Sequence, residues 1–360
     1  MLDALARLVA VESPSADQSA CARCADGVAE LASELLDGAA PERIVLDGAT
    51  HLRWIFGDAP TRVALIGHFD TVWPIGTLDE LPFKVEDGLA WGPGCFDMKA
   101  GIVQGLFALA ALGPDALNGV ALLLTSDEEL GSPSSRGLVE YTARGASAAL
   151  VLEPGVDGAL KTARKGVALY RLKVHGRSAH AGLEPQNGAN ALLGLSAALQ
   201  EITTLNDVGR GTTVTPTTAS AGTARNVVPD YAVCEVDVRG ETAEELQRVD
   251  GAMHALSPQI DGTSFEVEGG INRPPLDAAA SVDLFARAQR IARDIGMGEL
   301  RGAAVGGGSD GNFTAGIGVP TLDGLGAVGD GAHARHEHVV VDAMAPRADL
   351  LAALVRELLA

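Results

Sequence analysis

Short apolar runs alternate with amphipathic stretches through the first part of the chain. The runs at 62–72, 119–129 and 148–154 are almost continuously apolar and end in polar residues, which is typical of strands buried on both faces of a sheet. The Ala-rich stretches 18–36 and 98–112 are predicted to be helices. This alternation predicts an α/β domain with a mainly parallel sheet covered by helices on both faces.

The pattern changes near Gly166, where residues 167–176 alternate between apolar and polar side chains. Such alternation is typical of a strand with one exposed face. The segments that follow predict a β-α-β-β-α-β order, an α+β, ferredoxin-like sandwich. The predicted strands are 167–176, 212–222, 230–240 and 263–270. The predicted helices are 187–202 and 241–256.

After Pro274 the helix–strand pattern of the first part resumes, with a helix at 279–295, a short strand at 301–305 and a final helix from about 342. The simplest interpretation is a small domain inserted into a larger one. The predicted larger domain comprises residues 1–165 and 274–360, and the predicted inserted domain comprises residues 166–273.

Composition and charge exclude some classes of partner. The chain has 360 residues and a formal net charge of −20, which argues against binding to nucleic acid. We find no apolar run that reaches the roughly 18–20 residues of a membrane span and no signal-peptide pattern in the first residues, so we expect a cytoplasmic protein without a membrane partner. Cys21 and Cys24 form a lone CxxC in a helical stretch, which we interpret as structural.

Imidazole and carboxylate side chains follow several of the predicted strands. In an open α/β sheet, sites form beyond the carboxyl ends of the strands. Each of these groups is weak evidence alone, but five separated segments each offer a metal-type side chain at such a position. The groups are His68 with Asp70, Asp97, Glu128 with Glu129, Glu153, and the histidine run of His333, His336 and His338.

These residue types match the chemistry of a zinc hydrolase. Zinc binds imidazole nitrogen and carboxylate oxygen, and a catalytic site keeps a position open for water. Two metals about 3.5–4 Å apart need a bridging carboxylate and hold a hydroxide between them; Asp97 is the natural candidate. Glu128 and Glu129 can divide the roles of general base and ligand. Asp70 is placed to orient the second ring nitrogen of His68.

Six motifs in order along nearly the whole chain resemble the M20 family of metallopeptidases, and within it the glutamate carboxypeptidase branch. GHFDTV is similar to the first zinc motif, WGPGCFDMKAG to the bridging-aspartate motif and TSDEELGS to the motif that carries the base and a ligand. LEP is similar to the next ligand motif, AHARHEHV to the last histidine motif and GRSAHAG to a motif of the inserted lid.

The resemblance implies two metal ions, zinc in the first place, with cobalt or manganese compatible with the same ligands. One metal would take His68, Glu153 and Asp97, and the other would take Glu129, His333 and the same Asp97. Glu128 would be the general base. For the last histidine ligand the resemblance favours His333, with His336 in reserve.

Further expectations also come from the resemblance. The Asp97–Met98 peptide bond is expected to be cis. The inserted domain is expected to act as a lid and to form a homodimer, in which His180 would reach the partner's site and polarise the scissile carbonyl.

Members of the same branch bind the carboxylate of the substrate with Asn and Arg side chains of the lid, and Asn226, Arg239 and Arg273 match such positions. Arg suits carboxylates because its guanidinium binds them in a bidentate manner. The loop with Gly308 and Ser309 resembles a family loop that lines the substrate pocket.

We therefore predict a metal-dependent carboxypeptidase that cleaves an amide bond next to a free carboxylate, through a metal-bridging hydroxide with Glu128 as base. Its expected substrate is an N-acyl amino acid or short peptide, with a C-terminal glutamate implied by the branch. The first alternative is a deacylase or deacetylase of another N-acyl amino acid in a biosynthetic pathway.

Two alternatives belong to other classes. Gly307–Gly311 is a formal G-x-S-x-G, which would make Ser309 the nucleophile of a serine hydrolase with His333 as base and Asp323 or Asp330 as acid. A strong strand before the serine is lacking, and this alternative leaves the upstream carboxylates unexplained. A non-catalytic ligand-binding relative is disfavoured because every expected catalytic position is filled.

Overall fold

A computed structural model describes residues 1–360, and the chain forms two compact units. Unit 1 comprises Met1–Arg164, Leu276–Val305 and Ser309–Ala360, and unit 2 comprises Lys165–Pro275 with Gly306–Gly308. The predicted division after residues 165 and 273 lies one and two residues from these limits. The sequence pattern did not indicate that residues 306–308 belong with unit 2. The two units are described separately.

Unit 1 is built on a six-stranded sheet with the strand order β1-β2-β6-β3-β7-β14. Strands β6, β3, β7 and β14 run parallel to one another, whereas β2 is antiparallel to β6 and β1 is antiparallel to β2. The strands are β1 (Glu42–Leu46), β2 (Ala49–Phe56), β3 (Val63–His68), β6 (Val120–Thr125), β7 (Ala148–Val151) and β14 (Thr321–Leu322).

The sheet is therefore mixed: three of its five strand pairings are parallel, in line with the predicted mainly parallel sheet, and two antiparallel pairings were not predicted. The difference lies in the hairpin of β1 and β2, where Leu46 pairs with Ala49 across the turn residues Asp47 and Gly48. Both turn residues have positive φ, 50° and 86°, as a two-residue type I′ hairpin requires. The Asp-Gly dipeptide was the signal in the sequence that would have revealed this hairpin.

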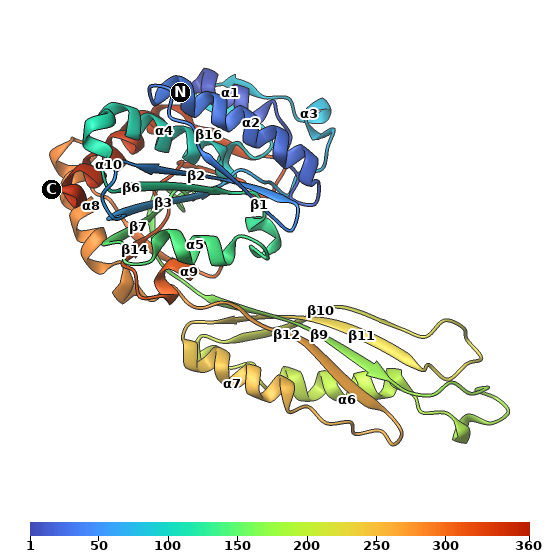
Figure 1. Ribbon diagram of the computed structural model, residues 1–360. Coiled ribbons are helices and arrows are strands. Elements are labelled where there is room, and N and C mark those ends of the chain that lie inside the picture. Colours follow the sequence, from blue (N-terminus) through green and yellow to red (C-terminus); the bar gives the residue numbers. More distant parts are fainter. The chain divides into compact units, whose positions relative to one another are not determined.

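Helices cover both faces of this sheet, and alternate residues of β3 enter two different cores. Val63 and Leu65 pack in the core below α1, α2, α4 and α10, whereas Ala64 and Ile66 pack with α5 and α9. Figure 1 shows α1, α2 and α4 on one side of the sheet and α5 and α9 on the other. The helices are α1 (Leu2–Val9), α2 (Gln18–Leu35), α4 (Ala100–Leu112), α5 (Arg136–Ala143), α8 (Val282–Asp294), α9 (Gly311–Gly316) and α10 (Val341–Leu359).

The segment that contains α4 corrects the expectation that no stretch has the length and apolar character of a membrane span. Residues 95–112 form an 18-residue helical window with a mean hydropathy of 1.4, and 72% of this window is buried inside the protein. The helix contacts α10, α2 and β3. Its apolar character is accounted for by its central place in the core.

Smaller elements complete unit 1. A four-stranded sheet has the order β15-β16-β5-β4, and β13 pairs in parallel with β8. The elements are α3 (Thr77–Glu80), β4 (Lys84–Glu86), β5 (Leu89–Trp91), β8 (Leu160–Arg164), β13 (Gly302–Val305), β15 (Gly329–Asp330) and β16 (His338–Val340). None of β4, β5, β15 and β16 was predicted, because strands of two or three residues are too short to show a period.

Unit 2 has the predicted β-α-β-β-α-β order, and its antiparallel sheet has the strand order β10-β11-β9-β12 of a ferredoxin-like sandwich. Figure 1 shows α6 and α7 side by side on one face of this sheet. The apolar side of each strand packs with these helices in a core of its own. The elements are β9 (Gly166–His175), α6 (Ala191–Thr203), β10 (Thr213–Ala221), β11 (Tyr231–Gly240), α7 (Ala243–His254) and β12 (Ser264–Arg273).

Candidate metal centre

The five predicted metal ligands come from five separate segments of unit 1. His68 ends β3, Asp97 lies in the irregular turn Cys95–Lys99 before α4, and Glu129 lies in the 3₁₀ turn Glu128–Leu130 after β6. Glu153 follows β7, and His333 lies in the loop between β15 and β16. The fold brings them into two groups of three, His68–Asp97–Glu153 and Asp97–Glu129–His333, whose ligand atoms lie within 4.8 Å of one another.

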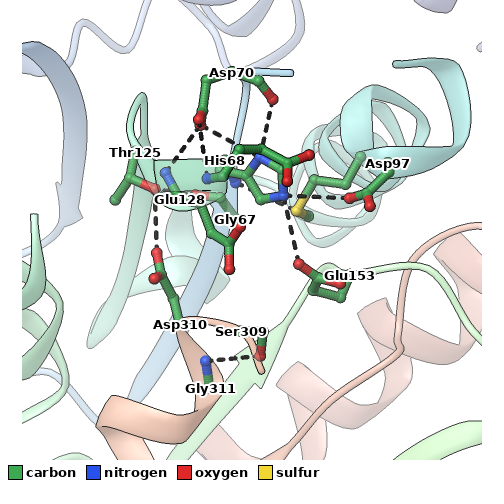
Figure 2. A network of polar contacts seen from close by, with 12 residues as sticks. Gly67, His68, Asp70, Asp97, Thr125, Glu128, Glu153, Ser309, Asp310 and Gly311 are labelled. Carbon is green, nitrogen blue, oxygen red and sulfur yellow. Dashed lines mark hydrogen bonds and ion pairs between the residues drawn. The ribbon is translucent and has the colours of Figure 1, made fainter. Parts of the chain in front are cut away.

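Asp97 belongs to both groups and offers one carboxylate oxygen to each. Its Oδ1 lies 3.3 Å from His68 Nε2, and its Oδ2 lies 3.4 Å from His333 Nε2. His68 Nε2 is also 3.4 Å from Glu153 Oε1, and His333 Nε2 is 3.0 Å from Glu129 Oε1. Figure 2 shows Asp97 and Glu153 converging on the His68 ring. This is the arrangement expected of a carboxylate that bridges two cations.

Two buried atoms of the first group have no hydrogen-bond partner in the protein and are suited to bind a metal ion. His68 Nε2 and Asp97 Oδ1 are buried and make no hydrogen bond. Buried polar atoms in proteins are nearly always hydrogen-bonded, so an exception needs an explanation. A nitrogen and an oxygen left in this way, in a set of imidazoles and carboxylates, are a donor set for zinc.

Asp70 connects the His68 imidazole to the turn that carries Glu128. Its Oδ1 lies 3.4 Å from His68 Nδ1 and accepts a hydrogen bond from the Glu128 N–H at 3.3 Å. Its Oδ2 accepts from the Glu129 N–H at 3.2 Å and from Ser15 Oγ at 2.7 Å. Asp70 is fully buried, and Figure 2 shows it above the His68 ring on the side away from Glu153. It therefore lies where a residue that orients His68 was predicted.

Glu153 is held by two cations that the sequence analysis missed. Its Oε1 faces His68, while its Oε2 accepts from Arg164 Nη2 at 3.0 Å and lies 3.3 Å from Lys161 Nζ. Arg164 in turn binds the buried Asp323 in a bidentate manner, at 2.7 and 3.1 Å. Lys161 and Arg164 are three residues apart, so regular alternation along β8 would place them on opposite faces. The β8–β13 register shifts between Lys161 and Ala163, and both cations lie near Glu153.

Glu337 holds the backbone around Asp97, and the sequence analysis assigned it no role. Its Oε1 accepts the N–H groups of Phe96 and Asp97 at 2.9 and 3.0 Å. Its Oε2 accepts the Gly94 N–H at 2.8 Å and the Trp73 indole N–H at 2.7 Å. Burial raises the pKa of the Glu337 carboxyl to about 7, although these four hydrogen bonds act in the opposite direction. The Asp97–Met98 peptide bond beside it is cis, as predicted.

The electrostatics of the centre follow from crowded acids around two imidazoles. Burial alone would lower the pKa of His68, but the neighbouring carboxylates of Asp70, Asp97 and Glu153 raise it well above its ordinary value. Hydrogen bonds with Asp97 and Glu129 raise the pKa of His333 to about 10. Burial raises the pKa of Glu129. Such a set of acids favours positive charge at its centre, carried by protons or by cations.

A buried network of hydrogen bonds holds the residues on either side of the Glu128 turn. Asp127 accepts hydrogen bonds from the hydroxyl groups of Ser134 and Ser135 at 2.7 and 2.5 Å. His51 of β2 lies 3.0 Å from Ser134 Oγ and accepts from the Ser126 N–H at 3.3 Å. Glu128 itself is 9% exposed. The network fixes the end of β6, from which both glutamates project.

The predicted substrate-binding residues of unit 2 have local partners. Arg239 is paired with Asp237 of the same strand through two hydrogen bonds of 2.8 and 2.7 Å. Arg273 is buried and donates to Asn272 Oδ1 at 3.2 Å, and a Cβ on Gly308 would lie 3.0 Å from its Cδ. The His180 ring accepts from the Gly182 N–H at 3.1 Å. Asn226 is joined to the His180 segment, because its carbonyl accepts from the Ala181 N–H at 2.9 Å.

The serine alternative receives no geometric support. Ser309 is fully buried, and its Oγ donates to Asp323 Oδ2 at 2.6 Å and accepts from the Gly311 N–H at 3.1 Å. His333, its proposed base, lies instead between Asp97 and Glu129. Of the histidine run, His333 and not His336 is in a ligand group.

Comparison with known proteins gives the family. The family model "Peptidase family M20/M25/M40" matches residues 64–357, which include all five ligand candidates. The chain belongs to peptidase family M20/M25/M40. Members of this family are metal-dependent hydrolases, typically with zinc, so the predicted M20 metallopeptidase or amidohydrolase is confirmed at this level.

Two similar relatives extend over most of the chain. Carboxypeptidase G2 of Pseudomonas sp. (strain RS-16) is 30% identical over 319 residues, which cover 84% of this chain and 75% of the relative. The succinyl-diaminopimelate desuccinylase of Azoarcus sp. (strain BH72) is 30% identical over 342 residues, which cover 88% of each chain. Both are hydrolases of the M20 kind, and they differ in what their names say they act on.

Solved structures agree on the fold. An M20 family metallo-carboxypeptidase of Sulfolobus solfataricus has a TM-score of 0.78 at 16% identity, with 99% of each chain covered. The aminopeptidase PepT of Bacillus cereus has a TM-score of 0.72 at 22% identity, with 99% of this chain and 97% of that chain covered. At these identities the likeness supports the M20 fold with its mixed sheets and nothing finer.

Proposed function

We propose that this M20 hydrolase binds two divalent cations, zinc in the first place, and cleaves an amide bond next to a free carboxylate. The observation that carries the proposal is the position of Asp97, whose two oxygens face two separate histidine–carboxylate sets at 3.3 and 3.4 Å. One set would hold a cation with His68 and Glu153, and the other with Glu129 and His333. Cobalt or manganese suits the same donors.

The bound cations would polarise the amide carbonyl and lower the pKa of an attacking water. The protein's own groups do the remaining work. Glu128 lies in neither ligand group and is assigned as the general base that takes the proton of the water and passes it to the leaving nitrogen. Asp70 keeps the His68 ring and the Glu128 turn in a fixed relation, since it contacts both.

The proposed substrate is an N-acyl amino acid or a short peptide with a free carboxylate, with C-terminal glutamate as the first choice. It is supported by two relatives whose names describe a carboxypeptidase and the removal of a succinyl group from diaminopimelate. Because the second name describes a deacylation, a deacylase of another N-acyl amino acid is the second candidate. We assign Asn226, Arg239 and Arg273 to the substrate carboxylate, and Gly308 and Ser309 to the lining of the pocket.

Further parts of the proposal concern assembly and location. Unit 2 is proposed to act as a lid and to form a homodimer, in which the partner subunit's His180 polarises the scissile carbonyl. We also propose a cytoplasmic location. Sedimentation equilibrium, together with activity recovered on mixing His180→Ala chains with chains that carry Glu128→Gln, would test the shared site.

The experiment for the main proposal is a hydrolysis screen on metal-replete protein, with ninhydrin detection of the released amine. The panel pairs each N-acyl amino acid with its C-terminal amide, which lacks the free carboxylate. We expect cleavage of the acids, weak or no cleavage of the amides, and loss of activity with a chelator that a serine-directed reagent does not reproduce. Equal cleavage of acids and amides would refute the carboxylate requirement, and activity that survives the chelator would refute the metal mechanism.

A further inference from the structure

Unit 1 contains a cavity of about 470 Å³ that none of the candidate metal ligands lines. It lies at α8 and α10, which contact each other and are neighbours in Figure 1. Its volume is in the range of small-molecule sites, roughly 300–1,000 Å³. The lining consists of the loop after α8 (295–300), one side of α10 (Ala343, Pro346, Arg347 and Asp349), Gly158 and Val328.

The wall formed by α10 contains a buried guanidinium without a carboxylate partner. Arg347 is 2% exposed, and its Nη1 and Nη2 donate to the carbonyls of Gly324 and Gly158 at 3.5 and 2.5 Å. Burial lowers its pKa to about 10, and no acid acts in the opposite direction. A guanidinium has five N–H donors, so these two bonds leave donors for another partner.

Arg164 shows how the same unit treats another buried guanidinium. It binds both oxygens of Asp323, at 2.7 and 3.1 Å, and Oε2 of Glu153 at 3.0 Å. Arg164 therefore has two carboxylates of its own chain, whereas Arg347 has only carbonyl oxygens. Because an uncompensated buried charge is costly, Arg347 is suited to a negative group from outside the chain.

Two acids also line the cavity, and neither forms an ion pair with Arg347. Glu299 and Asp349 are exposed. Asp349 lies two residues after Arg347 on α10, and side chains at that spacing do not face each other on a helix. Ile295 and Gly296 line the cavity directly after the carboxyl end of α8, where the helix dipole favours positive charge. The cavity thus offers partners for both signs of charge.

We infer that this cavity binds a free α-amino acid with an apolar side chain, in its zwitterionic form. Arg347 binds the carboxylate, Glu299 and Asp349 bind the ammonium group, and Met297 and Leu300 contact the side chain. A simple anion would lie beside two acids, and a simple cation would lie beside a guanidinium. A ligand with both charges avoids both conflicts. The inference does not depend on the proposed hydrolysis, because the cavity shares no residue with the two ligand groups.

The first test is calorimetric titration of L-leucine and two analogues into metal-replete protein. L-Leucinamide lacks the carboxylate, so we expect it to bind about tenfold or more weakly, the scale of a lost hydrogen bond between charged groups. The analogue 4-methylpentanoate lacks the ammonium group, and we expect it to bind about threefold or more weakly, the scale of an exposed ion pair. An affinity for either analogue equal to that for L-leucine would overturn the inference.

Variants distinguish binding in this cavity from binding at the metal centre. The double variant Glu299→Gln/Asp349→Asn removes two exposed acids, and we expect L-leucine to bind about threefold or more weakly. Asp342→Asn is the matched control, because Asp342 is an exposed acid of α10 that does not line the cavity. The same L-leucine affinity in the double variant and in the control would contradict the assignment of the ammonium group.

A third variant fills the cavity. Ala343 is half-buried and lines it, so Ala343→Trp should abolish L-leucine binding while the metal content stays at the wild-type value. If Ala343→Trp does not fold, the double variant decides. L-Leucine that still binds to folded Ala343→Trp lies elsewhere, which overturns the inference. A wild type that does not bind L-leucine overturns it as well, and Arg347 then serves only to hold the carbonyls of Gly158 and Gly324.

Discussion

The two units neutralise their buried carboxylates in different ways. In unit 2, Glu245 is 6% exposed and receives hydrogen bonds from Arg248 at 2.7 Å, Thr212 at 2.9 Å and Arg210 at 3.0 Å. These partners, Arg248 first, lower the pKa of Glu245 to about 2. In unit 1, Asp97 and Glu129 face each other across His333, and no arginine or lysine is paired with either.

This difference in partners distinguishes a buried carboxylate that stabilises the fold from buried carboxylates that are placed to bind a cation. Unit 2 balances the charge of Glu245 with arginines of its own chain, so its stability does not depend on a bound ion. In unit 1, Asp97 and Glu129 have imidazoles rather than arginines or lysines as ion-pair partners, and uncompensated buried charge is costly. The contrast predicts that cations act on unit 1 and leave unit 2 unchanged.

Substitution of the assigned base should have the largest effect. Glu128→Gln keeps the size of the side chain but cannot take a proton, so we expect kcat to fall by about 10²–10⁴-fold. Metal content, measured by inductively coupled plasma mass spectrometry, is expected to stay at the wild-type value. Glu30→Gln, an exposed change on α2, is the control. Full turnover in Glu128→Gln would remove Glu128 from the mechanism.

Addition of zinc to metal-free protein should stabilise unit 1 alone. A ligand at 100 times its dissociation constant contributes about 2.7 kcal/mol to the free energy of unfolding. Hydrogen exchange with mass spectrometry should show slower exchange in the segments that end β3, β6 and β7 and no change in β9–β12. Equal protection of both units would show that the contrast between them is wrong.

Glu337→Gln should weaken metal binding without removing a ligand. The amide NH₂ of glutamine would face the N–H donors of Trp73 or the Asp97 turn, so the backbone that positions Asp97 loses part of its support. Residues that orient ligands typically change metal affinity by about 10–100-fold. Competition with a chromogenic chelator measures this affinity, and an unchanged value would restrict Glu337 to a role in folding.

The smallest effect is expected from Glu245→Gln, and it should depend on pH. The folded pKa of about 2 lies below the ordinary value of about 4.3. The contribution of Glu245 to stability is therefore complete above the ordinary value and is lost as the pH falls towards 2. Urea unfolding should show wild type more stable than the variant at pH 7 and the difference shrinking between about pH 4 and 2. Turnover per bound metal should not change.

Much of the fold followed from local pattern. The β-α-β-β-α-β order of unit 2 was predictable in part because a strand with one exposed face alternates along its length, as β11 does from Tyr231 to Gly240. The buried strand β3 was equally clear, because all six of its residues are buried. The β1–β2 hairpin was not predicted because charged and polar residues interrupt the apolar residues of both strands, although Asp47-Gly48 marked the turn.

The chain by itself determined the chemical types of the centre and their order, because zinc binds imidazole and carboxylate groups and the motifs that carry them lie in separate segments of the chain. Only the tertiary structure decided that Asp97 turns one oxygen to His68 and the other to His333, and that Arg164, Lys161 and Glu337 support the ligands. The physical reason is distance along the chain. His333 and Asp97 are brought together by strand pairing and packing across most of the sequence, and no local pattern records which atoms then meet.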